Sequence, residues 1–136
     1  MTTTDRTGIE ILPLDDCKRM LEASRVGRVA FLHQGTVAIL PVNFRWHRGA
    51  VVFRSAEGAK LEAALGEQLV GFEIDAWDDE LHTGWSVLVE GRAEEVYDDL
   101  EITELESLGL RPWAEHPRRN RWVRIVAEEI TGRRIN

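Results

Sequence analysis

The sequence is poor in cysteine, in long apolar runs and in net positive charge, and each shortage excludes a class of protein. A single cysteine, Cys17, rules out an internal disulfide framework and a metal site built from several cysteines. This usage is typical of a reducing compartment, so we expect a cytoplasmic protein in which Cys17 has a packing role. No stretch approaches the ~18 apolar residues of a membrane-spanning helix, and residues 1–10 lack the apolar core of a signal peptide. The formal net charge of −7 argues against a nucleic-acid-binding surface.

The four histidines form no recognisable metal-binding or catalytic motif. His33, His47, His82 and His116 lie far apart, and no two have the spacing of a zinc-binding pair. Ser86 has no base that the sequence reveals, so no Ser-His-Asp set can be inferred. We therefore expect no metal site.

The chain is long enough for one globular domain with its own core, spanning residues 1–136 with residues 1–8 as a loose tail. Alternating or β-rich stretches predict six strands, at 26–33, 36–46, 50–55, 68–77, 85–97 and 121–130. Three helices are predicted between them, at about 15–24 with Asp15 as its cap, at 59–65, and after Asp98, which forms a capping box with Glu101.

The connections between these strands are short. Gln34-Gly35 and Arg48-Gly49 are predicted hairpin turns, and Gly91 indicates a bulge or bend. Crossovers long enough for parallel pairing are scarce, so the fold class is mainly β with flanking helices. We expect an antiparallel barrel that is closed or partly closed.

The stretch Pro41–Lys60 is a basic island in an acidic chain, with three arginines and Lys60 against one acid, Glu57. Arg54, Ser55 and Lys60 are predicted to converge where a helix begins. Charge-assisted donors at a helix N-terminus favour a phosphate. The alternative is that this basic cluster is ordinary solvated surface.

Pro41 interrupts the longest run of alternation in this region. A proline cannot donate to a strand ladder, and within sheets it belongs at an edge or a bulge. We expect the backbone near Pro41 to be available to another group, although many such edges bind nothing.

Four stretches together carry a family resemblance. They are Val26–Ala30, Leu40–Phe44, Val52–Ser55 with Gly58 and Lys60, and Gly84–Ala93. In this order and spacing they resemble the pyridoxamine 5′-phosphate oxidase-like family of flavin-binding split barrels, in the small branch related to nitroimidazole-resistance proteins. The resemblance extends from about residue 16 to residue 134.

The resemblance implies a six-stranded antiparallel split β-barrel that forms a homodimer, with flavin mononucleotide (FMN) bound at the subunit interface. A deazaflavin is the alternative cofactor. The implied contacts are Arg54, Ser55 and Lys60 at the phosphate, Pro41, Val42 and Asn43 along the ring, and Trp85 and Ser86 from the partner subunit. Some relatives of this fold bind haem, which is a weaker alternative here, with His47 or His116 as the candidate haem ligand.

The chain departs from true pyridoxamine 5′-phosphate oxidases at its last strand. Those enzymes hold the substrate with an arginine and a histidine, whereas Arg121–Arg124 contains no histidine. We therefore expect an FMN-dependent oxidoreductase, a reductase of a small molecule that the sequence does not identify. The alternatives are a flavin or deazaflavin carrier without turnover and a cofactor-free dimeric interaction protein. The sequence leaves open the roles of Trp113, Arg121, Arg124 and Arg133.

Overall fold

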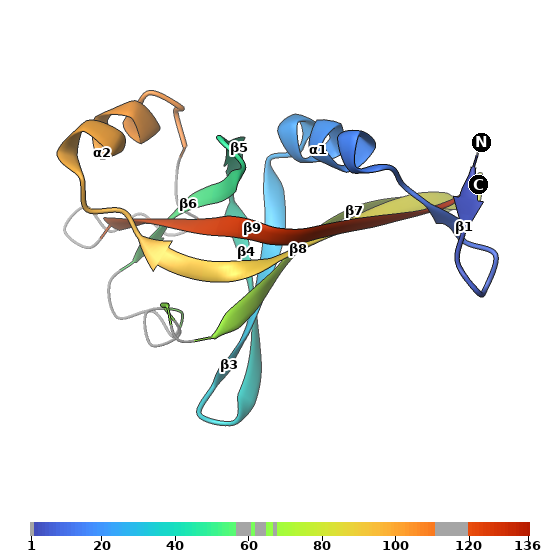
Figure 1. Cartoon of the computed structure of the whole chain (residues 1–136), viewed down its shortest axis with the longest axis horizontal. Helices are drawn as coiled ribbons and strands as arrows, with labels where there is room; N and C mark the ends of the chain where they lie inside the picture. Colours follow the sequence, from blue (N-terminus) through green and yellow to red (C-terminus); the bar gives the residue numbers. More distant parts are fainter. Residues whose placement is uncertain (1, 57–60, 62–64, 67, 111–119) are drawn as a thin grey trace.

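The computed structural model describes residues 2–56, 61, 65, 66, 68–110 and 120–136. In this part of the chain one antiparallel sheet is accompanied by two helices, α1 (Leu14–Ala23) and α2 (Asp99–Glu106), as Figure 1 shows. The prediction of a mainly β chain with flanking helices is confirmed. Within these residues no helix has the length and apolar character needed to cross a bilayer. The predicted helix at 59–65, apart from Leu61 and Leu65, lies outside the described residues.

The strands follow one another in the order in which they are numbered. They are β1 (Thr3–Thr4), β2 (Glu10–Ile11), β3 (Val26–His33), β4 (Thr36–Asn43), β5 (Arg45–His47), β6 (Ala50–Ala56), β7 (Leu69–Asp78), β8 (Thr83–Glu95) and β9 (Asn120–Ile135).

The sheet is open, which differs from the six-stranded barrel expected from the sequence. The described residues form nine strands, in the order β1-β2-β9-β8-β7-β3-β4, with β6 paired to β5 and β9 and no ladder between β4 and β6. Phe44 divides the strand predicted at 36–46 into β4 and β5. Its backbone N–H donates to the carbonyl of Arg25 at 2.9 Å, which extends the β3–β4 register one pair beyond Val26 and Asn43. The chain then continues into β5, which pairs with β6.

β9 joins β6, with its partner β5, to the other strands of the sheet. One edge pairs with β8, while the other pairs first with β6 and then, at its end, with β2. The last strand therefore runs beyond the predicted end at residue 130, because Arg133 pairs with Ser86 on one side and with Ile11 on the other. Residues 1–8, also expected to be loose, contain β1, which pairs with β2.

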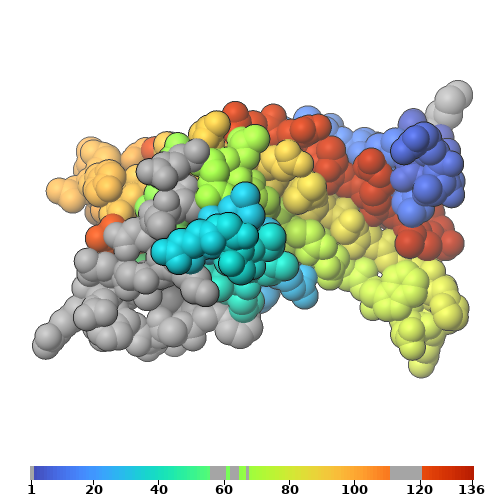
Figure 2. All heavy atoms as spheres, turned by 90° about the horizontal axis from the view of Figure 1, so that it is seen from below, coloured from blue at the N-terminus to red at the C-terminus, as the bar shows by residue number. Residues whose placement is uncertain are grey.

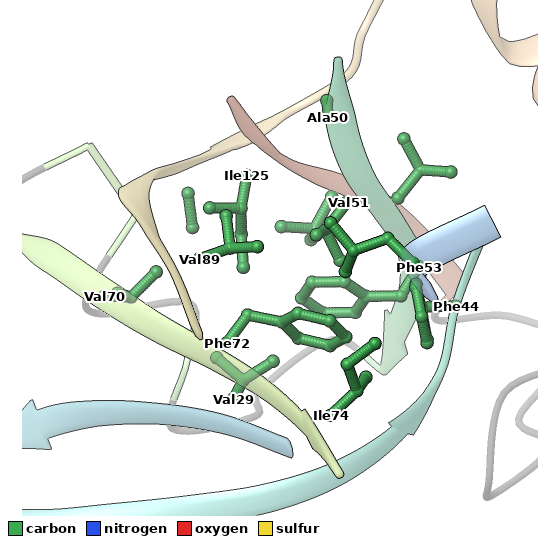
Figure 3. Packing of buried hydrophobic residues seen from close by; sticks show 14 of the residues in the cluster. Val29, Phe44, Ala50, Val51, Phe53, Val70, Phe72, Ile74, Val89 and Ile125 are labelled. Atoms are coloured by element: carbon green, nitrogen blue, oxygen red, sulfur yellow. The ribbon is translucent and has the colours of Figure 1, made fainter. Parts of the chain in front are cut away.

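Aromatic and branched side chains fill the core on the inner face of the sheet (Figure 3). Phe44, Phe53 and Phe72 are completely buried, and the rings of Phe44 and Phe72 meet edge to face with centroids 4.7 Å apart. Burial alternates along β3 and along most of β7 and β8, as a half-buried sheet requires. The core thus fixes which side chains of these strands point outward.

α1 packs against the sheet through Cys17 and Leu21, both completely buried. Its start differs from the prediction, because Pro13 occupies the N-cap position and Asp15 lies in the first turn. There the Asp15 carboxylate still interacts favourably with the positive end of the helix dipole.

The predicted N-cap of α2 is confirmed, while the side chain of Glu101, its predicted capping-box partner, accepts from Arg124 at 3.1 Å. Asp98 is its N-cap and accepts a hydrogen bond from the N–H of Glu101 at 3.0 Å. The β8–β9 ladder shifts register between Glu90 and Gly91, so the predicted bulge is also present.

Candidate functional site

β4 has one backbone edge that no strand covers in the described part of the chain, and Pro41 lies on it. Leu32 faces Val37 in the β3–β4 ladder, yet its N–H and C=O bond the side-chain amide of Gln68 at 2.9 and 2.8 Å. Leu32 and Val37 therefore form a pair without backbone hydrogen bonds across the ladder. In an antiparallel ladder such pairs alternate with hydrogen-bonded pairs. Pro41 and Asn43 follow Val37 at even spacing, so their backbone groups point away from β3. The missing N–H of Pro41 removes no ladder bond.

The three predicted ring contacts on β4 do not share a face. Pro41 is exposed on the outer face, and Asn43 follows it there two residues later. Val42 points inward and packs against the core. If the ring lies along this strand, Val42 contributes backbone and not side chain.

Among the predicted residues, Arg54 has the side chain best suited to hold an anionic ligand. It lies on β6 opposite Trp122 of β9, and its guanidinium carbon is 5.3 Å from the centre of the Trp122 ring. The Nε atom of Arg54 is buried and has no hydrogen-bond partner. A buried donor without a partner is costly unless a ligand satisfies it.

Of the other two predicted phosphate contacts, Ser55 and Lys60, the structure describes only Ser55. Ser55 follows Arg54 and pairs with Arg121 across the β6–β9 ladder. Lys60 lies outside the described residues. The structure therefore brings Arg54 and Ser55 to the end of one strand and leaves the position of Lys60 undefined.

Trp85 and Ser86 lie near the start of β8. Ser86 stands between Asp75 of β7 and Arg133 of β9, and together they form one row across three strands. All three residues line a hollow whose walls also include Trp85 and Trp77. This hollow combines aromatic walls with a hydroxyl, a carboxylate and a guanidinium, a composition typical of small-molecule sites.

The two halves of the predicted site lie far apart within one chain. Arg54 pairs with Trp122 and Ser86 pairs with Arg133, so the two positions are eleven residue steps apart along β9. At ~3.3 Å per residue this is about 35 Å along the strand. A single flavin cannot contact both ends of that distance, so Arg54 and Ser86 of the same chain do not belong to the same cofactor site.

One cluster on the outer face was not selected from the sequence. Arg28 of β3 pairs with Glu73 of β7, and its NH1 lies 3.2 Å from a Glu73 oxygen and 3.3 Å from an Asp75 oxygen. Burial, first of all, and then the hydrogen bond and charge of Asp75 raise the pKa of Glu73 to about 7, against the opposing effect of Arg28. The alternate positions of the two acids in one strand were the available signal, but their arginine comes from a distant segment.

The cluster lies on the same rows as the predicted cofactor residues. Pro41, Arg28 and Glu73 follow one another across β4, β3 and β7. Asp75 and Ser86 are paired in the neighbouring row. The outer face thus places a carboxyl pair between the predicted ring strand and the predicted partner contact.

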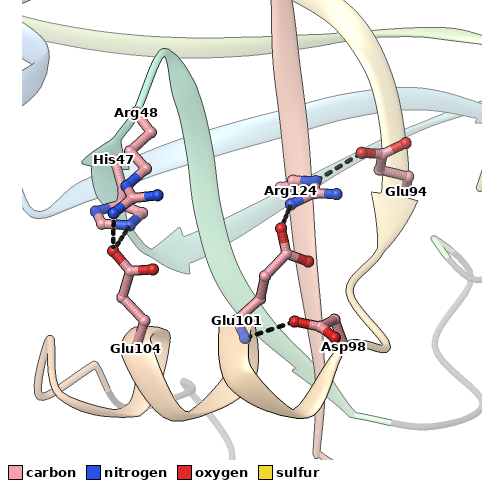
Figure 4. Close-up of polar contacts among 7 residues, drawn as sticks. All are labelled: His47, Arg48, Glu94, Asp98, Glu101, Glu104 and Arg124. Atoms are coloured by element: carbon pink, nitrogen blue, oxygen red, sulfur yellow. Dashed lines mark hydrogen bonds and ion pairs between the residues drawn. The ribbon is translucent and has the colours of Figure 1, made fainter.

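A second polar cluster joins α2 to the sheet (Figure 4). Glu104 of α2 accepts from Arg48 at 2.8 Å and lies 3.2 Å from Nε2 of His47, at the β5–β6 turn. Arg124 of β9 donates to Glu94 at 2.6 Å and to Glu101 at 3.1 Å. These pairs surround a pocket of about 210 Å³ and tie the helix to the strands beneath it.

The residues whose roles the sequence left open mostly have structural partners. Arg124 is engaged by α2 and β8, Arg121 bonds Glu95 at 3.0 Å, and Arg133 lies 3.4 Å from Asp5. Trp113 lies outside the described residues. In the described ranges no three histidine, cysteine or acidic side chains are grouped so that they could hold a metal ion.

Comparison with known proteins identifies the family of this chain. Residues 13–134 match the model of a family described as pyridoxamine 5′-phosphate oxidase. An uncharacterized protein of Mycobacterium tuberculosis is 35% identical over 129 residues, which cover 91% of this chain and 84% of the relative.

Solved structures agree with this match. The FAD binding protein from Mycobacterium smegmatis superposes with a TM-score of 0.78 at 37% identity, over 93% of this chain and 99% of that protein. A conserved protein of unknown function from Corynebacterium diphtheriae gives a TM-score of 0.75 at 31% identity, over 94% of this chain and 98% of its own. The family resemblance drawn from the sequence is confirmed.

Proposed function

Since the chain belongs to the pyridoxamine 5′-phosphate oxidase family, we propose that it binds a flavin through Arg54 and acts as an oxidoreductase on a small molecule. The observation that carries this proposal is the buried Nε of Arg54, which has no hydrogen-bond partner. A phosphate group would accept from this donor in a charge-assisted hydrogen bond, the strong class of such bonds.

The surroundings of Arg54 fit an anionic ligand. Trp122, which is 5% exposed, supports the guanidinium from one side and limits its freedom. Ser55 and Lys60 follow in sequence and supply a hydroxyl and a second positive charge. Asn43 would lie opposite Arg54 if the register of the β5–β6 ladder, in which Arg45 pairs with Val52, continued by two residues. The phosphate contacts and the ring strand would then adjoin.

The flavin that we expect is FMN, with a deazaflavin as the alternative. The similar protein from Mycobacterium smegmatis is described as FAD binding, so FAD is a third candidate. All three carry phosphate, and Arg54 addresses that shared group. The bound cofactor would supply the electron transfer, while the protein supplies binding, orientation and exclusion of water.

We further propose that the site is completed by a second copy of the chain. Pro41 and Asn43 of one subunit would contact the ring, and Trp85 and Ser86 of the partner subunit would contact it from the other side. The separation of about 35 Å between the two sets along β9 supports an assembly in trans. A homodimer would contain two such sites related by symmetry.

The binding half of this proposal is tested by titrating the purified protein, after removal of any bound cofactor, with FMN, FAD and riboflavin. Arg54→Met removes the charge-assisted donor, so affinity for FMN should fall about 10- to 100-fold, the equivalent of ~1.5–3 kcal/mol. Riboflavin has no phosphate, and its affinity should be unchanged. Arg54→Lys keeps the positive charge without the planar guanidinium, so its affinity for FMN should lie between those of the wild type and Arg54→Met.

The matched control for Arg54 is Arg48→Met. Arg48 is an exposed arginine at the start of the same strand pair, and its partner is Glu104. This change should leave the affinity for FMN unaltered. Equal loss of FMN and riboflavin binding in Arg54→Met, or no loss of either, would contradict a phosphate contact at Arg54.

The oxidoreductase half is tested by reducing the flavin-loaded protein and mixing it rapidly with candidate electron acceptors. An acceptor that reoxidises the bound flavin faster than it reoxidises free flavin supports an enzyme. A reduced flavin that no acceptor reaches supports a carrier without turnover.

A further inference from the structure

The outer face of β3, β4, β7 and β8 carries several exposed apolar side chains. Figure 2, seen from below, shows the β3–β4 hairpin beside β7, with the tip of the β7–β8 hairpin projecting at one end. The exposed apolar side chains on these strands include Leu32 at 56%, Val37 at 65%, Ile39 at 61%, Leu69 at 53%, Trp77 at 56% and Leu88 at 37%. Contiguous surface of this kind marks an interaction site.

Three charged groups lie in the middle of this apolar surface. One nitrogen of Arg28 contacts both Glu73 and Asp75, which holds the two carboxyl groups close together. With both carboxyls ionised the cluster carries a net charge of −1. With one shared proton it is neutral, so it can be covered by apolar surface at much lower cost.

Apart from Arg28, the neighbouring strands of the described chain place no positive charge directly beside Glu73. Pro41 of β4 continues its row beyond Arg28, and Leu88 of β8 faces it on the other side. The next charged residues on the same face are Glu90 and Arg92 of β8 and Glu129 and Arg133 of β9. Arg133 is engaged by Asp5. Proton uptake on the carboxyl pair is therefore the direct way to neutralise the cluster.

We propose that a second copy of the chain docks over this outer face, and that docking takes up one proton per chain on the Glu73–Asp75 pair. This inference rests on the homodimer of the proposed function and adds its regulation by pH. The occupant is a second copy because the cofactor site is incomplete in one chain, and because Pro41, Asn43 and Ser86 share the face with the cluster.

The linkage has a definite sign. Covering the face disfavours the ionised form of Glu73, so the dimer binds more protons than two separate chains. Association therefore weakens as pH rises above neutrality. If both chains present the same face, two protons are taken up and the dimer dissociation constant rises up to about 100-fold per pH unit.

The experiment is sedimentation equilibrium of the full chain between pH 5.5 and 8.5 at constant salt. We expect a dissociation constant that is low at acidic pH and rises steeply above pH 7. Glu73→Gln cannot ionise and should dimerise with little pH dependence. Asp75→Asn removes the partner of the shared proton and should flatten the profile as well, which covers the case in which one variant does not fold. Glu90→Gln, on the same face but outside the cluster, should keep the wild-type slope.

The outcomes separate this inference from the proposed function. A dimer whose dissociation constant is flat across this range overturns the proton linkage and leaves flavin binding untouched. A slope that persists in both Glu73→Gln and Asp75→Asn overturns the assignment to this pair. A chain that binds FMN in the titration but stays monomeric at every pH overturns the docking surface and the site shared between two subunits, and it leaves flavin binding through Arg54 untouched.

Discussion

Gly132 of β9 lies directly beneath Cys17 of α1. A β-carbon on Gly132 would be 2.6 Å from Sγ of Cys17 and 3.0 Å from Cδ1 of Leu12. The helix therefore rests on bare backbone, and the close approach depends on the absence of a side chain.

Gly132→Ala should lower the free energy of unfolding by ~1–3 kcal/mol, because the new methyl group overpacks the contact. Urea unfolding followed by tryptophan fluorescence measures the loss. Combining it with Cys17→Ala frees space at Sγ and should recover part of it. Gly71→Ala is the control, since its β-carbon would meet only Cδ1 of Leu88 at 3.7 Å. A Gly132 variant as stable as the Gly71 variant would contradict this contact.

Gly91→Ala should be more damaging than Gly132→Ala. At the β8–β9 bulge its β-carbon would lie 2.1 Å from the carbonyl oxygen of Val126, and backbone cannot move aside as a side-chain end can. We expect a loss of ~3 kcal/mol or more, measured by the same urea unfolding. A loss below that of Gly132→Ala would show that the bulge relaxes.

Asp98→Ala should destabilise the protein by about 1 kcal/mol, because the N–H of Glu101 loses its acceptor. Asn is an equally good cap, so Asp98→Asn should retain most of the stability. Circular dichroism and urea unfolding of the two variants provide the comparison. Equal losses would indicate that the charge of Asp98, and not its capping bond, supports α2.

Stability should also depend on pH through Glu73. Its pKa is raised from 4.5 to about 7 by folding, so between these values the folded chain retains a proton that the unfolded chain has lost. Stability from this residue therefore falls as pH rises through that interval and stays low above it. Glu73→Gln should raise the melting temperature relative to wild type above pH 7, with little difference at pH 4.

The same scan of melting temperature against pH on Glu90→Gln supplies the control for Glu73. Its difference from wild type should not follow the interval from 4.5 to about 7 in which Glu73 titrates. A Glu73→Gln difference that is constant with pH would contradict the raised pKa. Both proteins are compared at one concentration, because association also affects the melting temperature.

Features determined by local chemistry could be predicted from the sequence. Gln34 and Arg48, each followed by glycine, adopt the left-handed backbone that two-residue hairpin turns require. Asp98 caps its helix through a residue three positions away. In both cases the deciding contacts lie within a few residues.

Features determined by distant partners could not. The strand predicted at 36–46 divides because its pairing partner changes: Asn43 pairs with Val26 of β3, whereas Arg45 pairs with Val52 of β6. The strand at Thr131–Arg134 exists because Ile11 and Ser86 flank it, and its own pattern does not alternate. The same holds for the candidate site. Arg54 could be predicted from a sequence motif, whereas the contact of Arg28 with Glu73 and Asp75 depends on the β3–β7 register.

The double pairing of β9 has a consequence for synthesis. β2, β6 and β8 each pair with β9, and the ribosome makes β9 after every other described strand. A nascent chain that has not reached residue 120 carries several unpaired strand edges, the form in which chains aggregate or recruit chaperones. We therefore expect these strands to assemble only once β9 has been made, and not one by one as they leave the ribosome.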